Sequence, residues 1–241
     1  YVSRGIFLNM LRWVNPNLSE EYHKPNVMKP YSVTPLYFKC EKTREKGKCL
    51  LNPTHPCIMK VRLLRDKDVT YILNYFRGKD TITIYGETLH ISSISVQTKS
   101  YEELEKESKP TEKFRLYFKT PTYLASLGSG YHELFPNPTK VFPNLMRLWD
   151  QHTTTKKFGK EKLQEYKEWL TKNMGVTEYK LKTKLAKMGK KKTTGFIGWV
   201  TYETKTMDEW NKTTVMLAKY AEYSNIGGNR TGGFGVVKIK P

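Results

Sequence analysis

Apolar residues in the first hundred positions recur first with helical spacing and then with strand spacing. Over residues 5–14, Ile6, Met10 and Trp13 fall on one helical face. The other segments predicted from this spacing are a short helix over 18–23, strands over 31–39 and 57–64, a helix over 66–77, and strands over 81–85 and 89–96. Helix–strand–strand–helix–strand is the order of a ferredoxin-like unit without its first strand, so we expect a strand ahead of Tyr1.

The second half of the chain carries the complete pattern of such a unit. Its predicted elements are a strand over 114–118, helices over 141–151 and 160–174, strands over 179–188 and 194–202, a helix that begins at Thr206, and a strand over 236–240. Glu209, three residues after Thr206, predicts a capping box. The same helix carries a set of residues at core spacing: Trp210, Thr214, Leu217, Ala218 and Ala221.

These patterns predict an α+β protein of two tandem ferredoxin-like (RRM-like) domains, each with an antiparallel sheet and two helices. We assign residues 1–105 to the N-terminal domain and residues 106–241 to the C-terminal domain. The charged segment 102–111 contains Ser-Lys-Pro and is predicted to be the linker between them.

Composition narrows the class of function. The 241 residues are 38% hydrophobic and carry a formal net charge of +19. The hydrophobic fraction supports a packed core, and the excess of Lys and Arg indicates a polyanionic partner such as nucleic acid. Since the sequence contains no run of 18 apolar residues, we expect no membrane span.

The three cysteines are Cys40, Cys49 and Cys57. Their odd number and loose spacing argue against a disulfide framework and suit a reducing cytoplasm. Together with His55 they form a set of residues that zinc could use. The set lacks a CxxC pair, so free thiols are the favoured interpretation and a zinc-dependent nucleic-acid module is the alternative. We therefore expect no metal and no cofactor.

A glycine-dense loop precedes the last predicted strand. Four of the seven residues from Gly227 to Gly233 are glycine. Exposed backbone N–H groups in such a loop can form an anion nest, and Arg230 could hold a phosphate. The candidate RNA-binding residues here are Gly228, Asn229, Arg230, Thr231, Gly232 and Gly233. The alternative is a structural loop, with a helix C-cap glycine and a β-bulge.

A second basic feature lies in the strand over 179–188 and the turn after it. Because strand residues alternate between faces, Lys180, Lys182 and Lys184 share one face. The whole candidate set of phosphate contacts is Lys182, Lys184, Lys187, Lys190, Lys191 and Lys192, with Lys180 beside them. Phosphate contacts position a nucleic acid without reading its bases. A solvated strand and turn is the alternative.

The proline-bounded loop after residue 23 carries candidate chemistry. His23 is in this loop region, and histidine as a residue type can give and take protons near neutral pH. Lys29 adds a fixed cation six residues later. RNA self-cleavage needs proton transfer to and from oxygen atoms and a cation near the phosphorane, which these residue types supply without metal. Lys24, next to His23, is a further candidate RNA contact. A surface role for His23 is the alternative from spacing alone.

Three parts of the chain match one known pattern. The C-terminal part is Phe-Ile-Gly-Trp-Val over 196–200 followed by Ser-Asn-Ile-Gly-Gly-Asn-Arg-Thr-Gly-Gly-Phe-Gly-Val-Val over 224–237. The N-terminal part is Asn-Pro-Asn-Leu over 15–18, His23, and Lys-Pro-Tyr-Ser-Val-Thr over 29–34. The middle part comprises Pro138, Val141, Phe142, Leu145 and Trp149. With these parts the chain resembles, over nearly its whole length, the CRISPR-associated endoribonucleases that process precursor CRISPR RNA.

The resemblance implies an endoribonuclease that binds CRISPR repeat RNA. It implies metal-independent attack by a 2′-OH, which leaves 5′-hydroxyl and 2′,3′-cyclic phosphate ends. The catalytic histidine falls on His23, the catalytic lysine on Lys29, and the RNA-contacting loop on the glycine-dense loop. The resemblance also implies a prokaryotic protein and allows two further partners, a second copy in a homodimer and a CRISPR effector complex.

One position departs from the family pattern. Many members have a tyrosine in the first helix where this chain has Leu8. The general base is therefore open: Tyr22, Tyr31 or Lys24 could substitute, or His23 could act with lysines only. The same departure keeps a second hypothesis, a catalytically inactive CRISPR RNA-binding subunit of a larger ribonucleoprotein complex.

Overall fold

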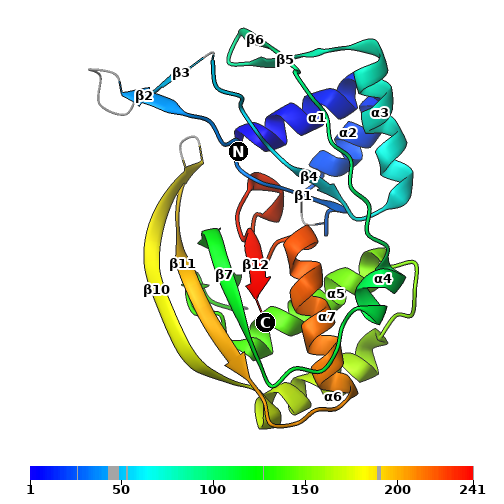
Figure 1. Cartoon of the computed structure of the whole chain (residues 1–241), viewed down its shortest axis with the longest axis vertical. Helices are drawn as coiled ribbons and strands as arrows, with labels where there is room; N and C mark the ends of the chain where they lie inside the picture. Colours follow the sequence, from blue (N-terminus) through cyan, green and yellow to red (C-terminus); the bar gives the residue numbers. More distant parts are fainter. Residues whose placement is uncertain (26, 43–48, 53, 127, 189–190, 241) are drawn as a thin grey trace.

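The computed structural model describes residues 1–25, 27–42, 49–52, 54–126, 128–188 and 191–240; at 40–42, 49–51, 187, 188 and 191 it describes the backbone alone. Figure 1 shows two halves stacked along the long axis of the molecule, with the N-terminal half above the C-terminal sheet and its helices. Within the described residues, no helix is both long enough and apolar enough to cross a membrane.

The N-terminal half consists of helices and short antiparallel strand pairs. Its helices are α1 (Val2–Val14), α2 (Pro16–His23), η1 (Asp66–Asp68) and α3 (Val69–Gly78). Its strands are β1 (Tyr31–Val33), β2 (Cys40–Lys42), β3 (Cys49–Leu51), β4 (Val61–Leu63), β5 (Thr81–Ile84) and β6 (Glu87–His90). The antiparallel pairs are β1 with β4, β2 with β3 and β5 with β6. The order of the helices and of β1, β4 and β5 is the predicted one.

Helix α1 organises this half because both of its apolar faces are buried. Phe7 and Leu11 pack in a cluster with Tyr31 from β1. On the other side, Ile6 and Met10 pack in a cluster that includes Tyr75 of α3, and the exposed Trp13 meets the Tyr75 ring edge-on at 5.5 Å. Helix α1 thus lies between two groups of elements, with α2 and β1 on one side and α3 and β5 on the other. The predicted face of Ile6, Met10 and Trp13 is confirmed.

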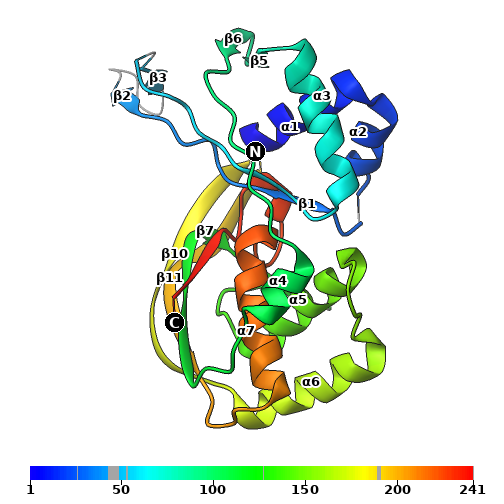
Figure 2. The same cartoon turned by 45° about the vertical axis from the view of Figure 1, so that its right-hand side comes forward.

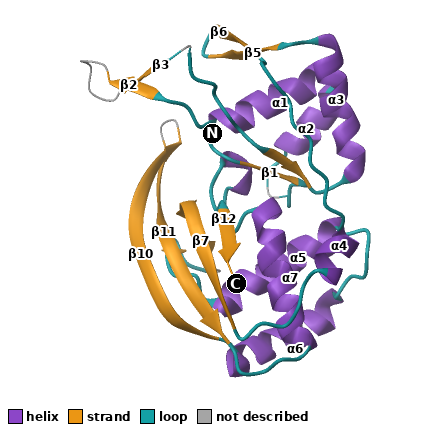
Figure 3. Cartoon of the chain, viewed as in Figure 1, coloured by secondary structure: helices purple, strands orange, loops and turns teal. Residues whose placement is uncertain are grey.

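The C-terminal half is a four-stranded antiparallel sheet with helices on one face (Figure 3). Its elements are β7 (Lys113–Thr122), β8 (Leu124–Ala125), β9 (His132–Glu133), α5 (Pro138–His152), α6 (Gly159–Asn173), β10 (Gly175–Met188), β11 (Lys191–Glu203), α7 (Glu209–Ser224), η2 (Arg230–Gly232) and β12 (Val237–Lys240). The strand order is β10-β11-β7-β12. If β7, β10, β11 and β12 are numbered 1 to 4, this order is 2-3-1-4. It is the ferredoxin-like order, in which each strand–helix–strand connection joins two strands that have one other strand between them.

Two local predictions are wrong. The predicted linker over 102–111 contains helix α4 (Tyr101–Lys106), whose capping box is formed by Ser100 and Glu103. Leu104 of α4 is buried in the C-terminal core. The last helix begins later than predicted, because the Asp208 side chain, and not Thr206, accepts the backbone N–H of Asn211. The division at residues 105 and 106 stays a prediction.

Candidate functional site

The glycine-dense loop begins where α7 ends and closes tightly on the rest of its own domain. The helix is capped by Asn225, in the left-handed region at φ 59°, so the predicted C-cap glycine is wrong. At Gly227 an added Cβ would lie 2.2 Å from the Tyr123 carbonyl oxygen, and at Gly235 it would lie 1.8 Å from that of Ile226. Glycine is required at these two positions because a backbone passes where a side chain would stand.

The predicted anion nest is wrong for three of its glycines. The backbone N–H of Gly228 donates to Tyr123, that of Gly232 to Asn229, and that of Gly233 to Arg230. These donors are satisfied by carbonyls of the same domain because the loop folds back through η2. The remaining candidates differ in exposure, since Asn229 and Arg230 are partly exposed and Thr231 is buried.

The segment around the end of α7 also joins the two halves. The Asn225 amide donates to the Val33 carbonyl of β1 at 3.0 Å, and Arg62 of β4 donates to the Asn225 side-chain oxygen at 3.3 Å. The Ser32 hydroxyl donates to the Tyr223 carbonyl at 2.5 Å. The first strand pair of the N-terminal half is therefore hydrogen-bonded to the end of the last helix, and the signatures from both ends of the chain meet here.

Arg230 links the same two parts of the chain. Its guanidinium donates to the Ser224 carbonyl at 2.7 Å and to the Lys29 carbonyl at 3.3 Å. The predicted phosphate grip stays a prediction, but the side chain is engaged by backbone oxygens. It fixes the segment that carries Lys29 against the glycine-dense loop.

His23 and Lys29 share one helix end. His23 is the exposed last residue of α2. Lys29 is a largely buried residue, and its ammonium, which is partly buried, donates to the carbonyls of Glu21, at 3.4 Å, and Lys24, at the C-terminus of the same helix. Burial lowers the pKa of Lys29, and the nearby charge of Arg4 lowers it further. The structure thus places a rigid cation, easier to deprotonate than an ordinary lysine, at the helix end that bears the histidine.

Two of the candidate substitutes for the missing helix tyrosine are poor bases. The Tyr22 hydroxyl is buried against Asp68 and accepts from Arg65 at 2.7 Å, and burial with the Asp68 interaction raises its pKa. Tyr31 is fully buried, stacks on Tyr22 at 5.3 Å, and has its pKa raised by burial. Both hydroxyls therefore hold their protons strongly. Lys24 is exposed at the end of α2.

Sequence reasoning missed Arg4. It lies on α1 one helical turn before the buried Leu8, and its positive charge acts on both Lys29 and the Tyr31 hydroxyl. Residues four apart share a helix face. Leu8 stands where many family members have a tyrosine. That departure could have directed attention to the neighbouring residues on the same helix face, Arg4 among them.

His152, the last residue of α5, was also missed. Its ring is hydrogen-bonded to the Lys29 backbone, and its Nε2 atom is buried without a hydrogen-bond partner among the described residues. Burial lowers the pKa of His152 to about 4, with the charges of Arg230 and Arg65 acting in the same direction. A neutral histidine therefore packs against the backbone of Lys29. The sequence gives no sign of this contact, because the two residues are far apart along the chain.

The predicted basic strand is present on β10. Lys180, Lys182 and Lys184 are exposed, as is Lys192 at the start of β11. Lys187 and Lys191 lie in the paired ends of β10 and β11, where only the backbone is described, and Lys190 lies outside the described residues. The phosphate-binding role of the whole set stays a prediction.

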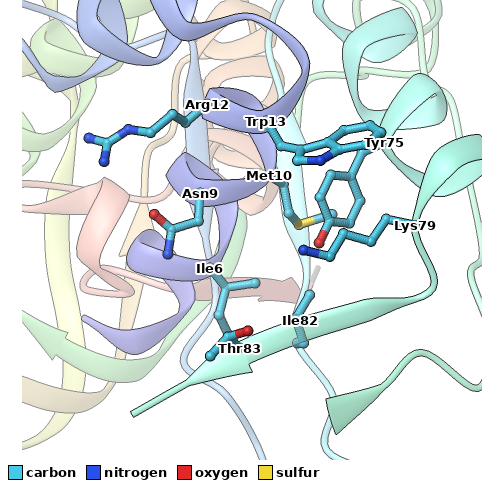
Figure 4. A pocket seen from close by; sticks show the side chains of 9 residues that line it. All are labelled: Ile6, Asn9, Met10, Arg12, Trp13, Tyr75, Lys79, Ile82 and Thr83. Atoms are coloured by element: carbon cyan, nitrogen blue, oxygen red, sulfur yellow. The ribbon is translucent and has the colours of Figure 1, made fainter. Parts of the chain in front are cut away.

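A cleft of about 340 Å³ lies on the far side of α1 from β1 (Figure 4). Its lining combines Ile6, Met10 and Ile82 with the rings of Trp13 and Tyr75, and it includes none of the predicted site residues. The Lys29 backbone lies instead at the junction between the halves, where it contacts Arg230 and His152.

The residues suggested for zinc are only partly described. The ring of His55 lies 3.2 Å from the Lys39 ammonium and 3.0 Å from the Thr54 hydroxyl, and Cys57 is a free thiol. The side chains of Cys40 and Cys49 lie outside the description. Among the side chains that are described, no cluster of three His, Cys, Asp or Glu residues could hold a metal ion.

Comparisons with known proteins relate the chain to one family. A family model described as "CRISPR-associated endoribonuclease Cas6" matches residues 116–237. The CRISPR-associated endoribonuclease Cas6 of Streptococcus thermophilus is 25% identical over 127 residues, 53% of this chain and 50% of that protein. The chain thus spans about half the length of the curated relative it matches.

Solved structures match over almost the whole chain. A Cas6 product complex gives a TM-score of 0.82 at 20% identity, covering 99% of this chain and 92% of that chain. The Cas6 of Thermus thermophilus gives 0.71 at 20% identity, covering 99% and 90%. At these identities the matches establish the fold, and the prediction of tandem ferredoxin-like domains is confirmed.

Proposed function

This chain belongs to the family of CRISPR-associated endoribonucleases Cas6, and on that premise we propose that it binds CRISPR repeat RNA and cuts it without a metal ion. The substrate class follows from the family and from the net charge of +19. Its place of action is the prokaryotic cytoplasm. Repeat RNA is its primary partner.

In the proposed reaction a 2′-OH attacks the adjacent phosphate. The 2′-oxygen loses its proton and bonds to phosphorus, the bond to the 5′-oxygen breaks, and that oxygen takes up a proton. The products are a 2′,3′-cyclic phosphate and a 5′-hydroxyl. His23 transfers protons, and the Lys29 ammonium stabilises the charge that develops on the phosphorane.

One observation carries this proposal: the ammonium of the largely buried Lys29 is hydrogen-bonded to backbone carbonyls at the end of α2, the helix whose last residue is exposed His23. A cation that is held before the substrate arrives needs no reorganisation as charge develops, which is the condition for strong electrostatic catalysis. Arg4 adds positive potential from α1, and Arg230 holds the backbone of residue 29 in place.

The experiment is cleavage of a matched repeat RNA in excess chelator, beside the same RNA with a single 2′-deoxy nucleotide at the cut site. We expect the all-RNA strand to be cut and the deoxy strand to be bound intact. His23→Ala should lower the cleavage rate by about 10²- to 10⁴-fold and leave RNA affinity nearly unchanged. His90→Ala, at an exposed histidine of β6, is the matched control.

A second candidate function is RNA holding without catalysis in a larger CRISPR complex. The observation that favours it is the protonated, buried state of Tyr22 and Tyr31, which leaves Leu8 without a tyrosine substitute. Binding of both RNAs without cutting of either would establish this function and remove the catalytic roles of His23 and Lys29.

The proposed homodimer is a separate question. Light scattering of the protein with and without RNA measures its mass in solution and so tests whether two copies associate.

A further inference from the structure

The four-stranded sheet has one face covered by helices and one face open. On the covered face, Phe114, Leu116 and Phe118 of β7 are buried in the core with residues of α5 and α7. The alternate residues of β7 point the other way. Figure 2 shows α5, α6 and α7 on one side of this sheet only. We call the uncovered side the open face.

One row of residues crosses the open face in register. The backbone pairs are Lys180 with Trp199 between β10 and β11, Trp199 with Tyr117 between β11 and β7, and Tyr117 with Lys238 between β7 and β12. Two aromatic rings therefore stand side by side on the two central strands, with a lysine on each edge strand. Both rings are partly exposed, and both lysines are exposed.

Further cations surround the two rings. The Arg115 guanidinium lies 3.9 Å from the centre of the Trp199 ring, and the ammonium groups of Lys119 and Lys240 lie 5.0 and 5.5 Å from that of Tyr117. Lys182 and Lys184 extend the cation row along β10. Across the part of the chain that is described, Lys119, Lys180 and Lys240 form no ion pair.

Three ion pairs offset part of this charge. Glu178 pairs with Arg115 at 2.7 Å, and Glu203 pairs with Lys113 at 2.9 Å. At the β12 edge, Glu222 of α7 pairs with Lys238 at 3.3 Å. The Arg115 guanidinium also donates to the Thr201 hydroxyl at 3.0 Å. This bond and the ion pair with Glu178 together hold the guanidinium over the Trp199 ring. The remaining lysines leave the open face strongly positive around a pair of rings.

We propose that the open face binds unpaired nucleotides of RNA, with bases stacked on Tyr117 and on the Arg115–Trp199 pair and with phosphates held by the surrounding lysines. This proposal deepens the proposed function and rests on it for the identity of the polyanion. Aromatic residues on the central strands of a four-stranded sheet suit single-stranded RNA, because every base has a face that can stack. Flanking cations neutralise the backbone.

The assignment separates two tasks within the chain. His23 and Lys29 lie at the junction of the halves, on α2 and the loop after it, whereas the open face belongs to β7, β10, β11 and β12. The face would therefore hold a single-stranded segment at a distance from the cut phosphate. Removal of its rings should weaken binding without changing the rate of cutting in RNA that is already bound.

The test measures binding of a ten-nucleotide oligouridylate by fluorescence anisotropy at one fixed salt concentration. Tyr117→Ala and Trp199→Ala should each weaken binding by about 5- to 150-fold, the equivalent of one lost base stack. Trp199→Phe should retain most of the affinity because it keeps a ring. Tyr179→Ala is the matched control: this exposed tyrosine of β10 points to the opposite face, edge-on to Phe135.

A second measurement does not depend on variants. Oligouridylate with 5-iodouridine is photocrosslinked to the wild-type protein, and we expect the crosslinked peptides to contain Tyr117 or Trp199. Crosslinks confined to other surfaces, or equal affinities for wild type, Tyr117→Ala and Trp199→Ala, would overturn the inference. A chain that binds oligouridylate through these rings but leaves repeat RNA uncut would refute the proposed cleavage and leave the open-face site standing.

Discussion

Acidification should destabilise this protein through one buried histidine. The pKa of His152 is about 4 in the folded chain, below its ordinary value of 6.5, because burial and the charges of Arg230 and Arg65 oppose protonation. The unfolded chain therefore binds the proton more readily. The unfolding free energy therefore keeps its full value, as far as His152 is concerned, above pH 6.5. It decreases as the pH falls toward 4, because protonation then favours the unfolded chain.

The size of this effect follows from the two pKa values. A difference of about 2.5 units corresponds to about 3 kcal/mol in full, of which about 2 kcal/mol is lost by pH 5. His152→Phe removes the titration. It also removes the hydrogen bond to Lys29, but that loss is the same at every pH. The difference in unfolding free energy between wild type and variant should thus shift by about 2 kcal/mol between pH 7.5 and pH 5.

The assay is urea unfolding of both proteins at the two pH values, with His90→Phe as the control at an exposed histidine. We expect the control to follow the wild-type pH dependence. If His152→Phe loses as much stability on acidification as the wild type does, the claim that the folded chain holds this ring neutral is wrong.

Three further predictions rest on single contacts. Gly235→Ala should lower the unfolding free energy by at least about 2 kcal/mol, because the added Cβ would meet the Ile226 carbonyl oxygen and the backbone has a φ of +67°. Gly130→Ala is the control, since its Cβ would stand in open space, and it should change the unfolding free energy by less than about 0.5 kcal/mol. Thermal melts compare the two variants. Asp68→Ala should lower it by about 3 kcal/mol, because the buried Tyr22 hydroxyl and Arg65 lose their shared acceptor; an effect no larger than that of Lys162→Ala, in an exposed pair, would contradict this. Lys29→Met should slow single-turnover cleavage of bound repeat RNA by about 10²-fold or more with little change in affinity; equal losses in rate and affinity would instead indicate a binding role.

The sequence alone determined the order of most elements. Apolar spacing is a local property, so the helices over 5–14, 141–151 and 160–174 and the strands over 179–188 and 194–202 were predicted within a few residues of their observed ends. The family resemblance, carried by short signatures, named His23, Lys29 and the glycine-dense loop. The segment over 102–111 was mistaken for a linker because Leu104 is a lone buried apolar residue among charged ones and gives no helical repeat.

Only the tertiary structure decided which of these residues meet and what they are free to do. The sequence predicted Arg230 as a phosphate ligand, and the structure shows in addition that its guanidinium binds the carbonyls of Ser224 and Lys29, two distant parts of the chain. Tyr22 and Tyr31 looked like candidate bases, but burial makes both hydroxyls hold their protons. His152 had no signal, and the row of Tyr117 and Trp199 depends on strand register. Burial, register and contact between distant segments are set by packing of the whole chain, which local spacing does not encode.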